Sequence, residues 1–268
     1  MPEKACVSVV VPCYCCSETI GRAISSIAQQ SLLPAEIILV DDCSSDETLQ
    51  ELYKVQANYP AGWIKVIACS LNSGAGTARN IGWNAATQMY IAFLDADDSW
   101  HPRKIEVQYG WMKNMPSVAL SGHACKNVND GFEVIAKSWD LALSIDFYEV
   151  SKNKILLSNP FPTPSVMVRA DIGYRFPEGK RYCEDYHLWA EICCAGLLCY
   201  RAEAALVYLH KAPYGEAGLS AALWEMEKGE LGVYLNIFRR GYIGLPRFVG
   251  LAGWSLGKYV KRLFRGRV

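Results

Sequence analysis

The chain contains no run of the roughly 18 to 20 uncharged apolar residues that a membrane-spanning helix needs. The nearest stretch, residues 241–257, is interrupted by Pro246 and Arg247. Internal repeats and low-complexity tracts are also absent, and 51% of the residues are apolar while 20% are charged. This is the composition of a folded, soluble protein, so we expect the whole chain to fold without crossing a membrane.

The cysteines lack the spacing of a zinc finger. Eleven are present, but Cys13, Cys15 and Cys16 have neither a second cysteine pair nor a histidine at zinc-finger spacing. Several others lie within apolar stretches, and no signal peptide precedes Cys6. We therefore expect reduced thiols and a cytoplasmic location, with peripheral attachment to the cytoplasmic face of a membrane as an alternative.

Acidic residues are missing after Glu230, whereas eight Lys or Arg residues follow it. Because the whole chain has 27 bases and 27 acids, its zero net charge hides an acidic body and a basic tail. Two faces of one helix are visible in the tail: Lys258, Lys261, Arg262 and Arg265 on one, and Ala252, Leu256, Tyr259 and Leu263 on the other. This pattern favours an amphipathic helix on an anionic membrane surface, through residues 245–268. A charged face that packs on the body is the alternative. No recognition motif accompanies the charge, so nucleic acid is not expected as a partner.

The first hundred residues alternate between strand-like and helix-like patterns. Short apolar runs rich in β-branched residues predict strands over residues 7–11, 36–40, 63–68 and 90–94. Three helical patterns lie between them: one capped by Ser17, one capped by Ser45, and one over residues 77–86. Such alternation predicts an α/β fold, with a mostly parallel sheet and helices on both faces. Ligands bind such sheets beyond the carboxyl ends of the strands.

The pattern after Pro102 is less regular. Possible strands cover residues 117–121 and 165–169, a loop covers residues 159–164, and a helix over residues 186–195 is stopped by Gly196. We expect this half to complete the sheet and to receive a second substrate.

Three carboxylates, those of Asp95, Asp97 and Asp98, follow the fourth predicted strand. Like charges packed so closely need a cation, and a hard divalent ion takes oxygen ligands and shares its shell with substrate phosphates. The cluster therefore suggests Mg²⁺ or Mn²⁺. Chance alone produces about half an Asp-x-Asp in a chain with this number of aspartates, so the context has to carry the prediction.

Three further clusters supply that context, and each has a structural alternative. Asp41 and Asp42 end the second strand, where they could accept hydrogen bonds from a nucleoside or merely cap a helix. Arg79 and the neighbouring Asn80 stand at a helix start that suits an anion, although a turn with a solvated arginine has the same pattern. The pair 184–185 could contribute a general base, or could simply stabilise the N-terminus of the following helix.

Five segments that contain these clusters resemble, in order and spacing, the family 2 glycosyltransferases of the GT-A fold. They are residues 9–14, 39–46, 78–80, 93–98 and 184–186. The resemblance is strong over residues 5–100, recovers around 160–215, and is absent or unspecific beyond about 220.

The resemblance implies roles for the residues that match the family pattern. The donor nucleotide sugar would contact Pro12, Tyr14, Asp41, Asp42, Arg79, Asn80, Asp95, Asp98 and Glu184. The metal would be held by Asp97, Asp95 and His210, with Asp97 as the main ligand. Asp185 would be the catalytic base that takes a proton from the acceptor hydroxyl as it attacks the anomeric carbon. A single displacement of this kind inverts that centre, and no carboxylate nucleophile is needed.

The implied protein is a metal-dependent inverting sugar transferase. Its donor would be a nucleoside-diphosphate sugar, most simply a UDP-sugar, and its acceptor a saccharide or lipid-linked hydroxyl in cell-envelope polysaccharide biosynthesis. Residues 1–220 would form the GT-A domain, a Rossmann-like mostly parallel sheet flanked by helices, with a nucleotide-sugar half (about 1–115) and an acceptor half (about 116–220). Residues 221–268 would form a helical, basic, amphipathic extension.

Cys15, Val207 and Tyr208 depart from residues common in the family, which leaves the contacts to base and diphosphate open. A catalytically silent sugar-binding relative is one alternative, although it would be expected to lose Asp97 or Asp185. An aspartate-nucleophile phosphatase and a nucleotidyltransferase are remote, because their motifs belong after the first strand and not after the fourth or third.

Overall fold

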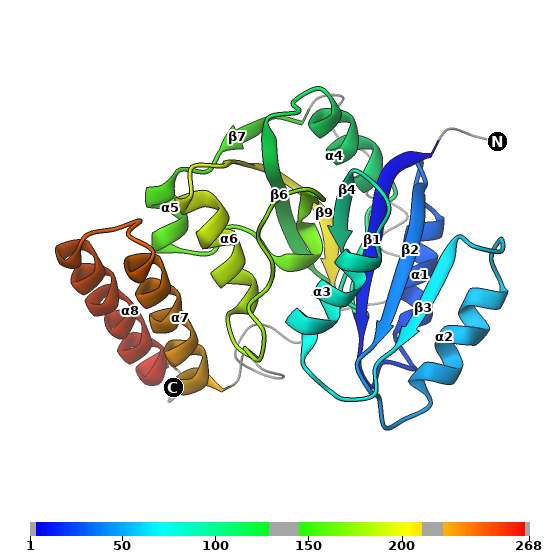
Figure 1. Ribbon diagram of the computed structural model, residues 1–268, viewed down its shortest axis with the longest axis horizontal. Helices are drawn as coiled ribbons and strands as arrows, with labels where there is room; N and C mark the ends of the chain where they lie inside the picture. The colour runs from blue at the N-terminus through cyan, green and yellow to red at the C-terminus, as the bar shows by residue number, and fades with distance from the viewer. Residues whose placement is uncertain (1–3, 129–144, 211–221, 266–268) are drawn as a thin grey trace.

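The computed structural model describes residues 4–128, 145–210 and 222–265, and within these a nine-stranded sheet is flanked by helices (Figure 1). The strands are β1 Ala5–Cys13, β2 Pro34–Asp41, β3 Ile64–Ala68, β4 Tyr90–Phe93, β5 Ser99–Trp100, β6 Val118–Asn127, β7 Phe147–Glu149, β8 Met167–Arg169 and β9 Leu198–Leu209. The helices are α1 Ile20–Ala28, α2 Thr48–Ala57, α3 Ala75–Ala85, α4 Lys104–Lys113, α5 Lys152–Leu157, α6 Glu184–Cys194, α7 Leu223–Arg239 and α8 Leu245–Arg265, and a short 3₁₀ turn covers Thr163–Ser165.

The strand order is β3-β2-β1-β4-β8-β6-β9-β5, and β7 lies off this path and pairs with residues 200–202 of β9. The first four strands in sequence are parallel where they pair, as the alternating pattern predicts. β8 then runs antiparallel to both β4 and β6, while β6 and β9 are parallel to each other. The expected halves of residues 1–220 therefore share one continuous mixed sheet.

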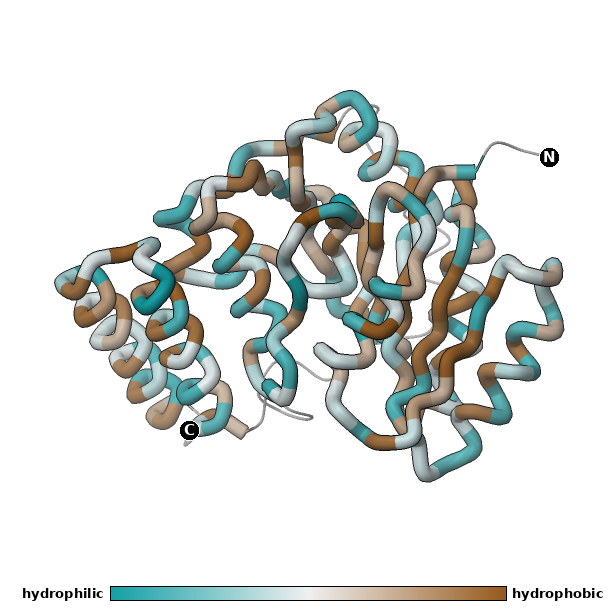
Figure 2. The backbone as a smooth tube through the Cα atoms, viewed as in Figure 1, coloured by the Kyte–Doolittle hydropathy of each residue, from teal (hydrophilic) through white to brown (hydrophobic). Residues whose placement is uncertain are grey.

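The core lies on both faces of this sheet because successive side chains of a strand point to opposite sides. In β1, Val9 and Val11 belong to one buried cluster and Val10 to the other. The inner strands accordingly form the strongly apolar segments of the backbone in Figure 2. All eleven cysteines lie in the described residues and are free, in agreement with the expectation of reduced thiols.

The predicted helix caps are wrong at two positions. α1 begins after Thr19 and α2 after Glu47, and neither start has a side-chain cap. The serines that were expected there serve contacts between loops: the Ser17 hydroxyl donates to the Asp46 carboxylate at 3.2 Å, and the Ser45 hydroxyl lies 3.7 Å from the Cys15 sulfur. These bonds hold the loops after β1 and β2 together.

The C-terminal residues form two helices that lie side by side, at the opposite end of the molecule from α2 (Figure 1). The rings of Phe238 and Phe248 stack between them, with centroids 5.2 Å apart. Glu230 of α7 forms ion pairs with Lys258 at 2.5 Å and Arg262 at 3.7 Å. Two of the four predicted surface cations of the tail thus face α7, as the packing alternative expects. No helix among the described residues has the length and apolarity to cross a membrane.

Candidate active site

A tight turn after β4 gathers the three aspartates. The backbone N–H of Asp98 donates to the Asp95 carbonyl at 3.1 Å, and Arg22 of α1 donates to the Asp97 carbonyl at 2.7 Å. One carboxylate oxygen from each of Asp95, Asp97 and Asp98 lies within 4.8 Å of the other two. Asp98 is fully buried, while the other two are partly exposed. Three oxygen ligands so close together fit a divalent cation such as Mg²⁺ or Mn²⁺.

His210 lies beside this cluster, because β5 and β9 pair antiparallel. Its Nε2 atom is 2.7 Å from the Ser99 hydroxyl. Burial lowers the pKa of His210, the Arg22 charge lowers it further, and the Asp97 charge opposes them. The structure therefore brings His210 near Asp97, but its ligation of the metal stays a prediction.

Arg79 connects the aspartate turn to the start of α6. Its guanidinium donates to the Asp95 carboxylate at 2.8 Å and to the Glu184 carboxylate at 3.0 Å, and it also lies over the Phe176 ring. The side chain is only 6% exposed. Burial alone would lower the pKa of Arg79, but the charges of Asp95 and Glu184 raise it. The structure thus shows a bridging role for Arg79 that its sequence position did not indicate.

Asp185 is held by the loop before β8. Its Oδ2 atom accepts hydrogen bonds from the Thr163 hydroxyl at 3.1 Å and the Asn159 amide at 3.4 Å, and its Oδ1 atom accepts from the Tyr186 backbone at 2.7 Å. Burial raises the pKa of the Asp185 carboxyl, and the Asp95 charge adds to this against the lowering effects of the hydrogen bonds and of Arg79. A carboxylate with a raised pKa is suited to accept a proton.

Glu184 differs from Asp185 because its carboxylate forms an ion pair with Arg79. Burial raises the pKa of Glu184 and the Asp185 charge adds to the rise, while Arg79 counteracts both. Asn80 is likewise engaged, since its amide donates to and accepts from the Phe176 backbone, at 2.8 and 3.0 Å. In the described structure, these two side chains join α3 to the segment before α6, and their contact with a donor stays a prediction.

The two aspartates at the end of β2 are almost fully buried, each 3% exposed. Asp42 accepts the backbone N–H groups of Ser73 and Gly74 at 2.9 and 2.8 Å, and Asp41 accepts that of Ser44 at 3.4 Å. Both therefore shape the loops around the predicted nucleoside site. Gly74 is required there, because its φ of +89° is unfavourable for residues with a Cβ atom.

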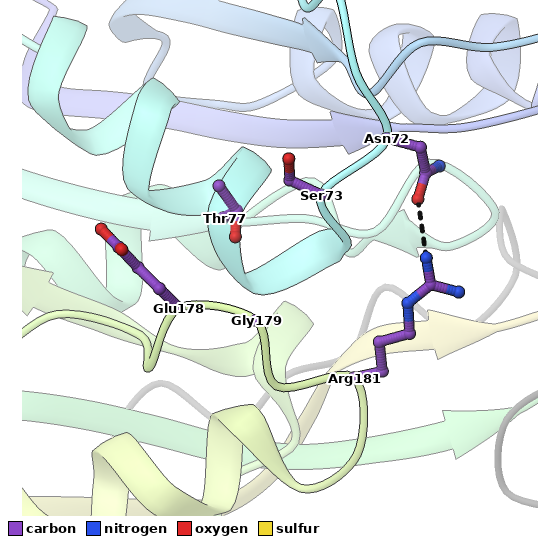
Figure 3. Close-up of a pocket in the computed structure, with 6 residues that line it drawn as sticks. All are labelled: Asn72, Ser73, Thr77, Glu178, Gly179 and Arg181. Carbon is purple, nitrogen blue, oxygen red and sulfur yellow. Dashed lines mark hydrogen bonds between the residues drawn. The ribbon is translucent and has the colours of Figure 1, made fainter.

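A cavity of about 340 Å³ lies between the β3–α3 loop and the segment before α6 (Figure 3). One wall contains Asn72, Ser73 and Thr77, and the other contains Glu178, Gly179 and Arg181. The Arg181 guanidinium donates to the Asn72 side chain at 3.3 Å, across the opening drawn in Figure 3.

Arg181 also bears on the predicted base site, because its charge lowers the pKa of Tyr14 against the larger raising effect of Cys15. Tyr14 is 54% exposed and Pro12 is partly exposed, so both are accessible at the same rim. Arg181, Asn159 and Thr163 were not predicted from the sequence. They lie in irregular segments, where no periodic pattern marks them.

A model of the glycosyl transferase family 2 matches residues 8–175, more than half of the chain.

The chain belongs to glycosyl transferase family 2.

The glycosyltransferase resembles one relative over nearly its full length and another over about two thirds of it. The TuaG protein of Bacillus subtilis, named as a teichuronic acid biosynthesis glycosyltransferase, is 27% identical over 99% of this chain and 98% of its own. The Escherichia coli enzyme WfgD, named as a UDP-Glc:α-D-GlcNAc-diphosphoundecaprenol β-1,3-glucosyltransferase, is 28% identical over 69% of both chains.

Among solved structures, the mannosyltransferase PcManGT of Pyrobaculum calidifontis, in complex with GDP-Man and Mn²⁺, superposes with a TM-score of 0.68. It is 17% identical, and the match covers 99% of this chain and 76% of that one. The family resemblance and the GT-A fold expected from the sequence are confirmed.

Proposed function

We propose that this glycosyltransferase transfers a sugar from a nucleoside-diphosphate donor to an acceptor hydroxyl by a metal-dependent, inverting displacement. The proposal rests on the contacts of Arg79. Its guanidinium bonds to Asp95, in the turn with three aspartates, and to Glu184, the neighbour of Asp185. Arg79 thereby connects the proposed metal site to the helix that contains the proposed base. The pKa of the Asp185 carboxyl is raised.

In the proposed reaction, the acceptor oxygen forms a bond to the anomeric carbon while the bond from that carbon to the diphosphate oxygen breaks. Asp185 takes the proton of the attacking hydroxyl, with its carboxylate oriented by Asn159 and Thr163. A cation held by Asp97 and Asp95, with His210 and Asp98 beside them, would neutralise charge on the departing nucleoside diphosphate. The products are the glycosylated acceptor and the free nucleoside diphosphate.

We infer that the donor is a UDP-sugar and that the product belongs to a cell-envelope polysaccharide. The names of WfgD and TuaG support these two assignments. The cavity supports a nucleoside site in this region, because it is lined by Ser73, whose backbone donates to Asp42, and by Arg181, whose charge acts on Tyr14. The acceptor would be a saccharide or a lipid-linked sugar, and residues 245–268 would bring the enzyme to an anionic membrane surface when it is lipid-linked.

The reaction is tested by Asp185→Asn, with sugar transfer measured against metal concentration. We expect Asp185→Asn to lower kcat by about 10² to 10⁴, the range for loss of a general base, while metal-dependent binding of UDP is retained. Asp171→Asn is the matched control, because Asp171 is exposed and pairs only with Arg169 among the described contacts. Full activity of Asp185→Asn would remove its assigned role.

A second variant, Asp97→Asn, tests the metal site. It should raise the metal concentration needed for half-maximal transfer, because one of the three carboxylate ligands is lost. Wild-type enzyme that binds UDP-sugars but transfers none to any acceptor would instead identify the chain as a silent binding relative.

A further inference from the structure

The outer face of α8 exposes an apolar stripe. Its side chains recur at spacings of four, seven, four and three residues, which places them on one side of a helix. They are Leu245, Val249, Leu256, Val260 and Leu263, each at least 40% exposed. Apolar and polar stretches alternate along this helix in Figure 2. The face that packs on α7 is a different one, since Leu251 and Ser255 are buried.

This stripe corrects part of the sequence-based expectation for the tail. Tyr259 was assigned to the membrane face, but its ring packs against Trp224 of α7 with centroids 5.6 Å apart. Val249 and Val260, which were not assigned, are 58% and 48% exposed. The accessible apolar surface is therefore rotated around the helix from the one that the sequence pattern suggested.

The charge of α8 is entirely positive. The helix carries five Lys or Arg residues and no Asp or Glu. Lys258 and Arg262 reach back to Glu230, while Lys261 is exposed. A helix with an exposed apolar stripe and basic residues on its other side matches a surface that is apolar inside and anionic outside, which is the chemistry of an anionic lipid leaflet.

The net charge of α8 favours an anionic partner, because the helix has five Lys or Arg residues and no acidic residue. We propose that α8 is an interfacial helix that binds an anionic lipid surface, with the stripe from Leu245 to Leu263 buried at the level of the headgroups.

The position of α8 determines where the proposed lipid contact lies relative to the candidate active site. In Figure 1 the end of α8 lies at the same edge of the molecule as the carboxyl ends of β1, β2 and β3 and the start of α6. Those ends carry the candidate active site. A lipid surface along α8 would therefore lie beside the edge from which an acceptor approaches Asp185.

The proposal is tested with the full chain by flotation on phosphatidylcholine vesicles containing about a third phosphatidylglycerol. Val260→Glu is expected to reduce binding by about tenfold or more, because it places a charge in the apolar stripe. Lys261→Gln is expected to reduce it about fivefold, the effect of one cation near an anionic surface. Tyr53→Glu, at a 50% exposed apolar position on α2, is the matched control and should bind as the wild type.

Wild-type binding by Val260→Glu, or equal loss in Tyr53→Glu, would overturn the proposal. Binding to pure phosphatidylcholine that equals binding to the anionic vesicles would also overturn it. A concentration-dependent dimer that Val260→Glu dissociates would show instead that the face joins two copies. The assay contains no donor and no acceptor, so its result is independent of the proposed reaction.

Discussion

Arg79 joins two parts of the site that the sequence separates by 105 residues. Its guanidinium forms ion pairs with both Asp95 and Glu184. The guanidinium charge lies between a carboxylate from the turn after β4 and one from α6, and it opposes their mutual repulsion. The sequence indicated an anion site at Arg79, but only the folded chain shows that the anions are its own side chains.

We expect Arg79→Met to destabilise the protein by about 3 to 5 kcal/mol, the usual effect of removing one partner from a buried ion pair. The measurement is urea unfolding followed by circular dichroism. Arg169→Met is the control, because Arg169 pairs with an Asp171 side chain that is 69% exposed, and such surface pairs contribute about 0 to 1 kcal/mol. Equal losses in the two variants would contradict the bridging role.

Asp185 gives the pH dependence of transfer a predictable sign. The base must be ionised, and its pKa is raised above the ordinary aspartate value of about 3.9 by burial and by Asp95. The rate should therefore fall, as the pH is lowered, at a higher pH than an ordinary aspartate would produce. The test is a profile of kcat/KM against pH, with an independent check that the enzyme stays folded. A rate that stays constant down to about pH 4 would exclude Asp185 as the base.

The same shift predicts a trade between stability and activity. A raised folded-state pKa means that folding favours the protonated form, so the ionised Asp185 costs stability once the pH has risen through that pKa. At pH 8, Asp185→Asn should raise the free energy of unfolding while it strongly lowers kcat. Asp171→Asn should act in the opposite direction, because its hydrogen bonds to Arg169 lower the pKa of Asp171 and stabilise its charged form.

At the scale of elements, α7 supports the start of α6. A Cβ atom on Gly229 would lie 3.0 Å from both the Cys183 sulfur and the Tyr182 carbonyl oxygen, and the Cys183 thiol donates to the Met226 carbonyl at 3.5 Å. Cys183 has a positive φ of 55° directly before α6. The helix that contains the proposed base therefore begins at a strained residue held by α7.

Gly229→Ala should lower kcat and destabilise the fold by about 1 to 3 kcal/mol, because the start of α6 has to shift to admit a methyl group. Gly253→Ala in α8 is the matched control: nothing lies within 4 Å of its Cβ position, so it should stabilise the helix by about 0.5 to 1 kcal/mol. Both effects can be measured by thermal unfolding and initial rates. An active, stable Gly229→Ala protein would mean that α6 does not depend on this contact.

The elements of the first half were predictable because each strand and helix has a clear period. The sequence placed strands at 7–11 and 90–94, inside β1 and next to the aspartate turn. β9 was missed, since Arg201 and Glu203 interrupt its apolar pattern and its pairing with β6 contains register shifts. Long-range pairing of this kind leaves no local signal in a single sequence.

At the scale of the whole molecule, the sequence predicted the family and the positions of the acidic clusters, but not how they connect. The bond from Arg79 to Glu184 and those from Thr163 to Asp185 depend on the tertiary fold. The sequence also could not show which face of α8 is exposed, because this depends on the ion pairs of Lys258 and Arg262 with Glu230 of α7. Helical spacing identifies the faces of a helix but not which face its neighbour covers.

Membrane contact and catalysis should be separable in the intact enzyme. With a lipid-linked acceptor in anionic vesicles, Val260→Glu should reduce transfer about tenfold, because less enzyme reaches the acceptor. With a soluble saccharide acceptor, the same variant should transfer at the wild-type rate, since Val260 lies on α8 and outside the candidate site. Equal losses with both acceptors would show that the substitution damages the fold.

The contact at Gly229 also limits where this chain can be joined to a relative in a chimaeric protein. The family match ends at residue 175, and the sequence suggested a boundary after residue 220. A chimaera joined after residue 220 would set one parent's residue 229 against the other parent's residues 182 and 183, and a Cβ atom at position 229 would lie within 3.2 Å of both. A transplanted C-terminal segment therefore has to include the residues just before the proposed base, or keep glycine at position 229.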